Sequence, residues 1–362
     1  MKGIYFINCW KDLKSAWSGT PNGLFNALSK HSEVTEIHLY KKSGRISYIL
    51  NSLTMQMMRN HAIEKQIDGL DISGNQPVFA FGEYFSKSVK NTYCYQDLSV
   101  DYILRLRQEK HPAANFALAK VIPTSIAKLK NRKAKRFYRD CAGVFTMSEW
   151  LRNDLIENTG LPAEKVHHVG GGCSIDVAKI DSSKKQGNRF LFVGIDWNRK
   201  NGALVVEAFQ KIAGQCTNAA PELYIAGPTD KPECIPQTES IHFLGRLTRE
   251  ELIQYYNLCD YFVMPSVFEA YGLVFVEALC FGLPCIGNNI CAMPEFIQDG
   301  QNGLLIYQNS VDELAKGMEK MLEEGPAMAR YVQENRDTYI RKYSWDSVAD
   351  RIIQVLRTDG LL

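Results

Sequence analysis

The hydrophobic pattern predicts short buried strands that alternate with helices along the whole chain. Apolar runs rich in β-branched and aromatic residues recur at 3–8, 36–40, 77–82, 91–99, 189–194, 221–228, 240–245 and 261–266. Runs of this kind are typical of strands buried on both faces of a parallel sheet. Segments with helical periodicity lie between them, for example 22–31, 311–324 and 344–360. We therefore expect an α/β protein with doubly wound sheets.

The chain length and one glycine run indicate two domains. At 362 residues the chain exceeds one ordinary hydrophobic core. The segment with the lowest propensity for helix or strand is the run Gly170, Gly171 and Gly172. A charged segment follows at 181–188. We expect an amino-terminal domain over 1–178 and a second domain over 187–343.

The segment 260–306 carries the strongest candidate chemistry. A buried strand at 261–266 is followed by a loop with Glu269 and by an apolar helix at 273–282 that contains Glu277. A carboxylate inside such a helix is costly unless something hydrogen-bonds to it. Ligands gather at the carboxyl ends of parallel strands, where a helix amino terminus attracts anions and carboxylates accept hydroxyl protons. A nucleotide sugar fits this pattern; the alternative is a core helix with a capped or paired glutamate.

The sequence FEAYGLVFVEALCFGLPCIGNNICAMPEFIQDGQNGLLI resembles the E-x7-E signature of retaining glycosyltransferases of family 4. The spacing comes with a preceding P-S, a following G-x-P and a later D-G-x-N-G-x-L. The resemblance implies a GT-B fold, in which two Rossmann-like domains face a central cleft and the last helix, 344–362, returns towards the first domain. It implies that Glu269 contacts the donor sugar and that Glu277 holds the ribose hydroxyls. The residues expected to bind the donor between them are Tyr271, Gly272, Leu273 and Val274, with the backbone amides of 272–274 facing the diphosphate.

The loop after the strand at 189–194 supplies two candidate cations. Arg199 and Lys200 are placed to neutralise a diphosphate and the charge that grows on it as the sugar leaves. The resembling family has a G-x(n)-[RK]-K-x-G loop with this role, although Ile195 stands where many members have arginine. Either the pair acts alone or Arg199 reaches in from a different position, and a solvated basic loop is the alternative.

The resemblance implies four further donor contacts, from two loops. Arg246 and Leu247, after the strand at 240–245, would receive the nucleobase through backbone atoms. Gly19 and Thr20 lie in a small-residue loop before a helix, which suits a phosphate cradle or a simple tight turn.

The family often has a histidine in the middle of the first domain, and here no histidine occurs at the expected place. Asp97 is the polar residue there, as a catalytic contact or a helix cap. His111, in a loop, is the alternative.

Net charge is only +2, but its distribution is uneven. Residues 1–180 hold 25 Lys and Arg against 16 Asp and Glu, whereas the remainder holds 17 against 24. The segment 127–140 concentrates seven cations with interleaved apolar side chains. It indicates either contact with anionic lipid or a solvated helix face. Nucleic acid is not expected as a partner, because no recognition motif accompanies the charge.

Cellular location follows from what the sequence lacks. The apolar start is too short for a signal peptide, and no 18-residue apolar run occurs. We expect a cytoplasmic protein with peripheral contact at the inner membrane face. The ten cysteines contain no C-x-x-C pair, which indicates reduced core residues.

These features together predict a retaining hexosyltransferase. It would move a hexose from a nucleoside diphosphate sugar, such as a UDP-sugar, to a sugar or lipid-linked hydroxyl acceptor in polysaccharide, glycolipid or other glycoconjugate assembly. No cofactor or metal is expected, since no D-x-D motif occurs. The alternatives are a nucleotide-sugar epimerase of the same fold and a catalytically silent binding partner.

Overall fold

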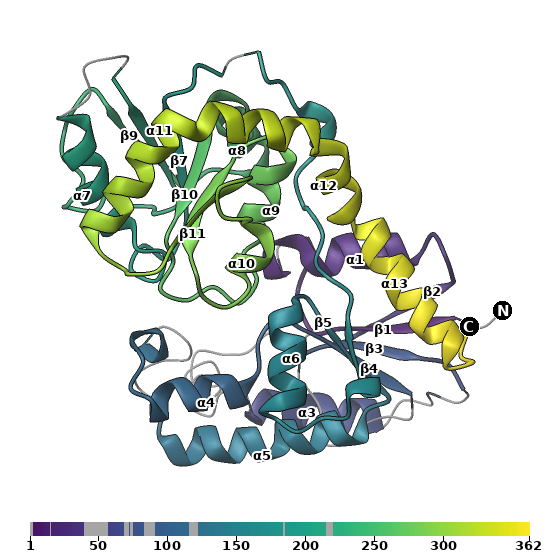
Figure 1. The fold of residues 1–362 in the computed structure, drawn as a ribbon. Helices are drawn as coiled ribbons and strands as arrows, with labels where there is room; N and C mark the ends of the chain where they lie inside the picture. Colours follow the sequence, from purple (N-terminus) through teal and green to yellow (C-terminus); the bar gives the residue numbers. More distant parts are fainter. Residues whose placement is uncertain are drawn as a thin grey trace. The chain divides into compact units, whose positions relative to one another are not determined.

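The computed structural model describes residues 3–14, 16–39, 57–68, 72, 75–82, 91–115, 122–183, 185–214 and 220–362. The chain divides into two compact units (Figure 1). The first unit comprises Met1–Gly172 and Ser344–Leu362, and the second comprises Cys173–Tyr343. Each unit has one six-stranded parallel sheet with helices packed on it.

The sheet of the first unit has the strand order β2-β1-β3-β4-β5-β6. Its strands are β1 Ile4–Asn8, β2 Val34–His38, β3 Val78–Phe81, β4 Thr92–Gln96, β5 Gly143–Thr146 and β6 Val166–His168. Strands β3, β4 and β5 are wholly buried, as the continuous apolar runs predicted. The strand order reverses at β1, so the expected ligand-binding edge lies at the carboxyl ends of β1 and β3.

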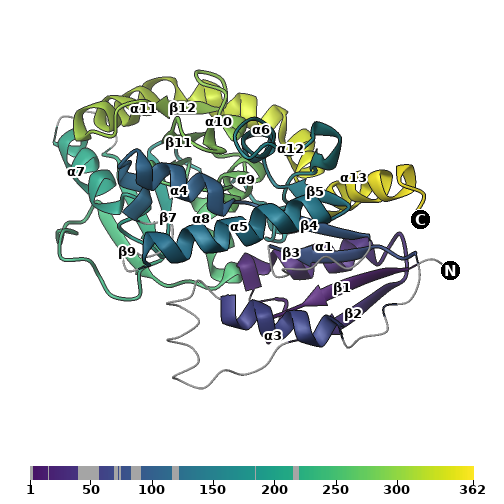
Figure 2. The ribbon, with the colours of Figure 1, turned by 90° about the horizontal axis from the view of Figure 1, so that it is seen from below.

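The helices of the first unit cover both faces of this sheet. They are η1 Ala16–Gly19, α1 Thr20–Leu28, α3 Met57–Asp68, α4 Val100–Gln108, η2 Pro112–Asn115, α5 Thr124–Asp140, α6 Glu149–Glu157, η3 Ala163–Lys165 and α13 Trp345–Thr358. Side chains of α3, α5 and α6 pack on one face, against Ile7, Ala80 and Val144. Helix α1 packs on the other, where Phe25 meets Phe6 at a ring distance of 5.2 Å. Helices α4 and α5 run side by side in both ribbon views (Figures 1 and 2).

Helix α13 follows the whole second unit in sequence but belongs to the first, where it packs on α1. Its first residue, Trp345, fits only because two neighbours are glycines. A Cβ at Gly23 would lie 2.3 Å from the indole nitrogen, and one at Gly172 would lie 2.4 Å from the ring. Close packing therefore explains Gly172, the last residue of the glycine run.

The sheet of the second unit has the strand order β12-β11-β10-β7-β8-β9. Its strands are β7 Arg189–Val193, β8 Glu222–Ala226, β9 Ile241–Gly245, β10 Tyr261–Met264, β11 Cys285–Asn288 and β12 Gly303–Ile306. Its helices are η4 Val177–Lys179, α7 Gly202–Ala213, α8 Arg249–Leu258, α9 Leu273–Cys280, α10 Met293–Phe296, α11 Val311–Glu334 and α12 Arg336–Lys342. The order reverses between the neighbouring strands β7 and β10, which places the loops after them together.

The boundary between the units falls earlier than the interval 178–187 expected from the sequence. Residues from Cys173 onward are tied to the second unit by hydrogen bonds. The Cys173 amide donates to Tyr343 O at 2.7 Å, and Asn257 Nδ2 donates to Lys179 O at 2.8 Å. The Asp181 amide donates to Asn257 Oδ1 at 2.9 Å. The charged segment is therefore part of the second unit's surface.

The D-G-x-N-G segment is a structural turn. Asn302 is buried; its Nδ2 donates to Phe296 O at 2.8 Å, and its Oδ1 accepts from the Gln298 amide at 2.7 Å. Asp299 Oδ1 accepts from the Leu305 amide at 2.9 Å. These bonds fix the entry into β12, so this part of the motif has no need of a ligand.

Candidate functional site

The loop between β10 and α9 is shaped by Gly272. This residue has φ +94°, and a Cβ would lie 2.9 Å from the Phe275 ring and 3.1 Å from Glu269 Cγ. Glycine is needed for both reasons. It precedes α9, where Leu273 and Val274 have amides without an acceptor inside the helix. The amino terminus of α9 therefore presents donors and a partial positive charge.

Glu269 lies in this loop and pairs with both predicted cations. Lys200 Nζ and Arg199 Nη1 contact the same oxygen, Glu269 Oε2, with the arginine at 3.0 Å. The side chains of Lys200 and Glu269 are only 9% and 12% exposed. Burial acts to raise the pKa of Glu269, but Lys200 and Arg199 outweigh it and hold that pKa below its usual value. Burial lowers the pKa of Lys200, although Glu269 opposes the shift.

Asp196 completes the cluster and was missed in the sequence. Arg199 Nε donates to Asp196 Oδ2 at 3.2 Å, while Arg199 Nη1 also donates to Phe268 O at 2.8 Å. Two cations and two carboxylates therefore balance in charge, whereas the sequence singled out only the two cations of this loop. Ile195, at the position where arginine is common in the resembling family, is 61% exposed.

Glycines and asparagines hold the two loops together. A Cβ at Gly194 would lie 2.7 Å from Lys200 Cγ, so the end of β7 leaves room for the lysine stem. The Val267 amide donates to Arg199 O at 2.9 Å. Asn201 Nδ2 donates to Pro265 O at 2.8 Å, and Asn288 Nδ2 reaches the same carbonyl at 3.1 Å. The asparagines were missed because an asparagine after a strand is also a common turn residue.

Glu277 lies on α9 and is 7% exposed. It accepts a hydrogen bond from the Tyr256 hydroxyl of α8 at 3.1 Å. Burial raises the pKa of Glu277 to about 7, against the opposite effects of Tyr256, Arg249 and Lys200. The predicted conflict between this carboxylate and its apolar helix is therefore present, and one hydroxyl relieves it in part. Sequence patterning could not have singled out Tyr256, which resembles a core aromatic residue.

The remaining predicted residues of the second unit have different surroundings. Tyr271 is buried and packs edge-on against Phe296 at a ring distance of 5.0 Å, so its ring is part of the core. Arg246 and Leu247 connect β9 to Thr248, whose capping box with Glu251 starts α8. Arg246 is exposed and Leu247 is half-buried.

Of the predicted residues of the first unit, Gly19, Thr20 and Asp97 lie in or after the loops that follow β1 and β4, whereas His111 follows helix α4. Gly19 has φ +79° and is the N-cap of α1, and Thr20 is buried in the first turn. Asp97 follows β4 and is half-buried, but the cap of α4 is Ser99, whose Oγ accepts from the Tyr102 amide at 3.1 Å. The helix-cap interpretation of Asp97 is therefore wrong. His111 is exposed, and its Nδ1 accepts from the Ala113 amide at 3.2 Å, a contact within its own turn.

The basic segment forms helix α5, which is amphipathic. Ala127, Ala134, Phe137 and Tyr138 are buried, whereas an exposed face carries Lys128, Leu129, Arg132, Lys133, Arg136 and Arg139. Leu129 is 47% exposed among these cations. Lys135 lies outside this face and pairs with Asp101 at 2.8 Å.

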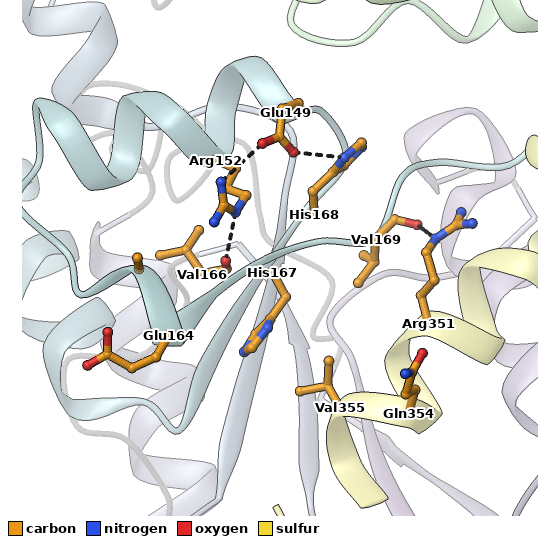
Figure 3. A pocket seen from close by; sticks show the side chains of 11 residues that line it. Glu149, Arg152, Glu164, Val166, His167, His168, Val169, Arg351, Gln354 and Val355 are labelled. Atoms are coloured by element: carbon orange, nitrogen blue, oxygen red, sulfur yellow. Dashed lines mark hydrogen bonds and ion pairs between the residues drawn. The ribbon is translucent and has the colours of Figure 1, made fainter. Parts of the chain in front are cut away.

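A hollow of about 410 Å³ lies on the first unit along β6, between α6 and α13 (Figure 3). Glu149, Arg152 and Arg351, which line the hollow, are engaged with neighbouring side chains or with the edge strand. Glu149 contacts Arg152 at 3.0 Å and His168 at 3.1 Å. Arg152 Nε donates to Val166 O at 3.2 Å, and Arg351 Nε donates to Val169 O at 2.7 Å. These contacts cover the open edge of the sheet.

The described ranges of the chain contain neither a metal cluster nor a membrane-spanning helix. No group of three or more His, Cys, Asp or Glu side chains there could hold a metal ion. No described helix is both long enough and apolar enough to cross a bilayer.

The region around this cluster matches a known family. Residues 176–338 match the family model of glycosyl transferases group 1. The matched segment lies within the second unit and is similar to that family over a little less than half of the chain. The match covers both loops of the ion-paired cluster, as well as Tyr256 and Glu277. The match agrees with the resemblance to glycosyltransferases that the sequence of 260–306 carries.

Two relatives of known name align with about three fifths of the chain. An uncharacterized glycosyltransferase of Methanocaldococcus jannaschii is 27% identical over 242 residues, which are 61% of this chain and 60% of that protein. A phosphatidyl-myo-inositol mannosyltransferase of Mycobacterium tuberculosis is 26% identical over 60% of this chain and 59% of its own length. The similarity thus spans about 60% of each relative.

Solved structures extend the similarity in fold to almost the whole chain. Sucrose-phosphate synthase from Thermosynechococcus elongatus has a TM-score of 0.76 at 15% identity, over 99% of each chain. WaaG, a glycosyltransferase involved in lipopolysaccharide biosynthesis, has a TM-score of 0.68 at 15% identity, over 97% of this chain and 99% of its own. The fold is GT-B, as predicted, with the group 1 region in the second unit.

Proposed function

We propose that the chain is a retaining, metal-independent glycosyltransferase that moves a hexose from a nucleoside diphosphate sugar to a hydroxyl acceptor. The observation that carries this proposal is the buried cluster of Arg199, Lys200 and Glu269 beside the first amides of α9. The cluster lies where the strand order of the second unit's sheet reverses, between β7 and β10. The region that matches the group 1 family model includes this sheet. Both the fold and the charges favour an anionic ligand there.

Donor binding uses atoms that the cluster leaves available. Arg199 hydrogen-bonds through Nε and Nη1, and among the described residues no side chain or carbonyl contacts its Nη2. Lys200 has three N–H groups, and Glu269 is its single hydrogen-bond partner within the described ranges. We assign these donors and the Leu273 and Val274 amides to the diphosphate. Glu269 orients the sugar, and Glu277 accepts from the ribose hydroxyls.

The reaction then needs mainly electrostatic assistance. The acceptor oxygen bonds to the anomeric carbon on the face from which the diphosphate departs, and the bond from that carbon to the phosphate oxygen breaks. The acceptor proton passes to the departing phosphate oxygen. Arg199 and Lys200 stabilise the charge that develops on this oxygen. This route gives retention, and it uses neither a protein nucleophile nor a metal.

Donor and acceptor are assigned only by class. A UDP-sugar is the first candidate, and the mannosyltransferase among the relatives makes a nucleoside diphosphate mannose the second. The acceptor is a sugar or a lipid-linked hydroxyl, used in polysaccharide, glycolipid or other glycoconjugate assembly on the cytoplasmic side of a membrane.

The deciding experiment measures donor turnover. The chain is incubated with UDP-glucose, UDP-galactose, UDP-N-acetylglucosamine and GDP-mannose, and released nucleotide and the anomeric configuration of any product are followed by NMR. We expect slow donor hydrolysis or transfer with retention in the wild type. Loss of at least a hundredfold is expected in Glu269→Gln, because that substitution removes a charged contact to the reacting sugar. Glu207→Gln, an exposed change on α7, is the matched control.

Other outcomes would favour the alternatives. A changed sugar still attached to the nucleotide would indicate an epimerase. Binding of nucleotide without turnover of any donor would indicate a silent binding protein, which the absent histidine near Asp97 would explain.

We also propose that the exposed face of α5 contacts anionic lipid, where each nearby cation contributes about 1 kcal/mol. Leu129, exposed among the cations of this face, would enter the headgroup region. Flotation with vesicles containing phosphatidylglycerol tests this. Replacement of Lys128, Arg132 and Lys133 by glutamine should abolish flotation, whereas Lys211→Gln in the second unit should not. Equal flotation of both variants would refute the contact.

A further inference from the structure

Tyr256 is a core residue with one polar atom that core packing does not require. Its ring is fully buried in α8 and packs against Phe281 at a ring distance of 5.4 Å. A phenylalanine would fill the same space. The hydroxyl donates to Glu277 Oε2 at 3.1 Å. The role of the hydroxyl is therefore the hydrogen bond to the Glu277 carboxylate, and the packing of the core does not depend on it.

Glu277 needs more partners than the protein gives it. Within the described ranges of the chain, the Tyr256 hydroxyl is its single hydrogen-bond donor. An ionised carboxylate can accept about four hydrogen bonds, and burial with unfilled acceptor sites is costly. Oε2 is oriented by Tyr256, and Oε1 is left for a ligand. Two neighbouring hydroxyl groups, as on a ribose, would supply the missing donors.

The charged and titratable groups around Glu277 come from three elements. Arg249 and Tyr256 belong to α8, Lys200 belongs to the loop before α7, and Cys280 follows on α9. Burial raises the pKa of Glu277 to about 7, while Tyr256, Arg249 and Lys200 act to lower it. The carboxylate is therefore partly protonated at neutral pH in the free protein, and Tyr256 favours the ionised form that accepts hydroxyl protons.

We propose that Tyr256 is a positioning residue for the nucleotide: its hydroxyl holds one oxygen of the Glu277 carboxylate in place and directs the second oxygen at the ribose hydroxyls. This inference rests on the proposed function, since it needs a nucleoside diphosphate at α9. The proposed function alone does not predict the following consequence. Discrimination between ribose and 2′-deoxyribose should depend on pH and on a tyrosine that the nucleotide does not touch.

The test compares ribo and 2′-deoxy nucleotides, because the phosphate itself titrates near pH 6 and this effect cancels in their ratio. Dissociation constants of UDP, dUDP, GDP and dGDP are measured by calorimetry on the full chain at pH 6, 7 and 8. The base that binds more tightly is then used. In the wild type we expect the ribo form to bind about tenfold more tightly at pH 8, and the ratio to fall severalfold at pH 6.

The variants distinguish the effect of Tyr256 on the ratio of ribo to deoxy binding from the effect of Glu277. In Tyr256→Phe we expect the ratio at pH 7 to fall to about threefold, and its pH dependence to shift upward by roughly one unit. In Glu277→Gln the ratio should become independent of pH, and adding Tyr256→Phe should change it no further. Tyr255→Phe, at the next position of α8, is the matched control and should behave as the wild type.

Each remaining outcome is decisive. A wild-type ratio and pH dependence in Tyr256→Phe would overturn the role of Tyr256 and leave the proposed function intact. Equal binding of ribo and deoxy forms by the wild type would overturn it too. Failure of the wild type to bind either base at 1 mM would overturn the inference and the proposed function together.

Discussion

Lys200 and Glu269 form a buried ion pair between two loops that are 69 residues apart in sequence. The pairing exists because β7 and β10 are neighbours in the sheet, so the loops at their carboxyl ends meet. Arg199 shares the same carboxylate oxygen at 3.0 Å. The two loops are therefore held in one arrangement before any ligand arrives.

Replacing Lys200 should cost stability as well as activity. Lys200→Met leaves Glu269 buried with Arg199 as its remaining cation, so we expect a loss of about 2 kcal/mol in the free energy of unfolding. The double variant Lys200→Met with Glu269→Gln should lose less than the sum of the single changes. Urea unfolding measures this. Lys211→Met, which breaks the exposed pair with Asp312, should show no measurable change, and equal losses in both lysine variants would contradict the argument.

Gly272→Ala should distort the start of α9. The residue combines φ +94° with a Cβ position 2.9 Å from the Phe275 ring, so strain and steric overlap add to about 2 kcal/mol or more. Gly300→Ala is the control, because Gly300 has φ +78° but nothing within 4 Å of its added Cβ. The melting temperature should fall several degrees further for Gly272→Ala. Nucleoside diphosphate binding should weaken in that variant alone.

Local signals in the sequence predicted α9 and its loop well. The strand before it, the end of the helix near Gly282 and the position of Glu277 all follow from hydrophobic pattern and glycine placement, which act over a few residues. The family signature follows from the same segment. These features needed no knowledge of which strands are neighbours.

The contacts between distant segments could not be predicted in this way. Asp196 with Arg199, Lys200 with Glu269, and Tyr256 with Glu277 depend on loop conformation and strand order, which the hydrophobic pattern does not specify. The unit boundary was misplaced for the same reason, because Asn257 binds residues 179 and 181 from a distant helix. Asp97 was a plausible cap, yet Ser99 lies at the position that α4 requires.

Asp260 should be essential for anchoring the segment that enters β7. Its carboxylate is buried and accepts from the amides of Gln186, Asn188 and Arg189 at 2.9 to 3.0 Å. Asp260→Ala leaves three donors unpaired and should cost about 3 kcal/mol or more. Asp260→Asn keeps one acceptor oxygen and should lose less. Hydrogen exchange at these three amides should accelerate in the same order, and unchanged exchange in Asp260→Ala would contradict this anchoring role.

Glu277 should make the ligand-free protein less stable as pH rises. Its pKa is about 7 in the fold, because of burial, and about 4.3 in an unfolded chain. Between pH 4.3 and pH 7 the folded protein therefore keeps a proton on Glu277 that the unfolded chain has lost. The contribution of Glu277 to the free energy of unfolding is greatest below pH 4.3 and declines until pH 7. The total decline is roughly 4 kcal/mol, since each pKa unit is equivalent to about 1.4 kcal/mol.

Glu277→Gln removes that titration while keeping an acceptor for Tyr256. The variant should match the wild type below about pH 4 and exceed its unfolding free energy by roughly 4 kcal/mol at pH 8. The difference between the two proteins, measured by urea unfolding at each pH, cancels every other titrating group. A gain in stability with a loss of nucleotide affinity would mean that this carboxylate is kept for a ligand and not for the fold. A difference that is constant from pH 5 to pH 8 would contradict the raised pKa.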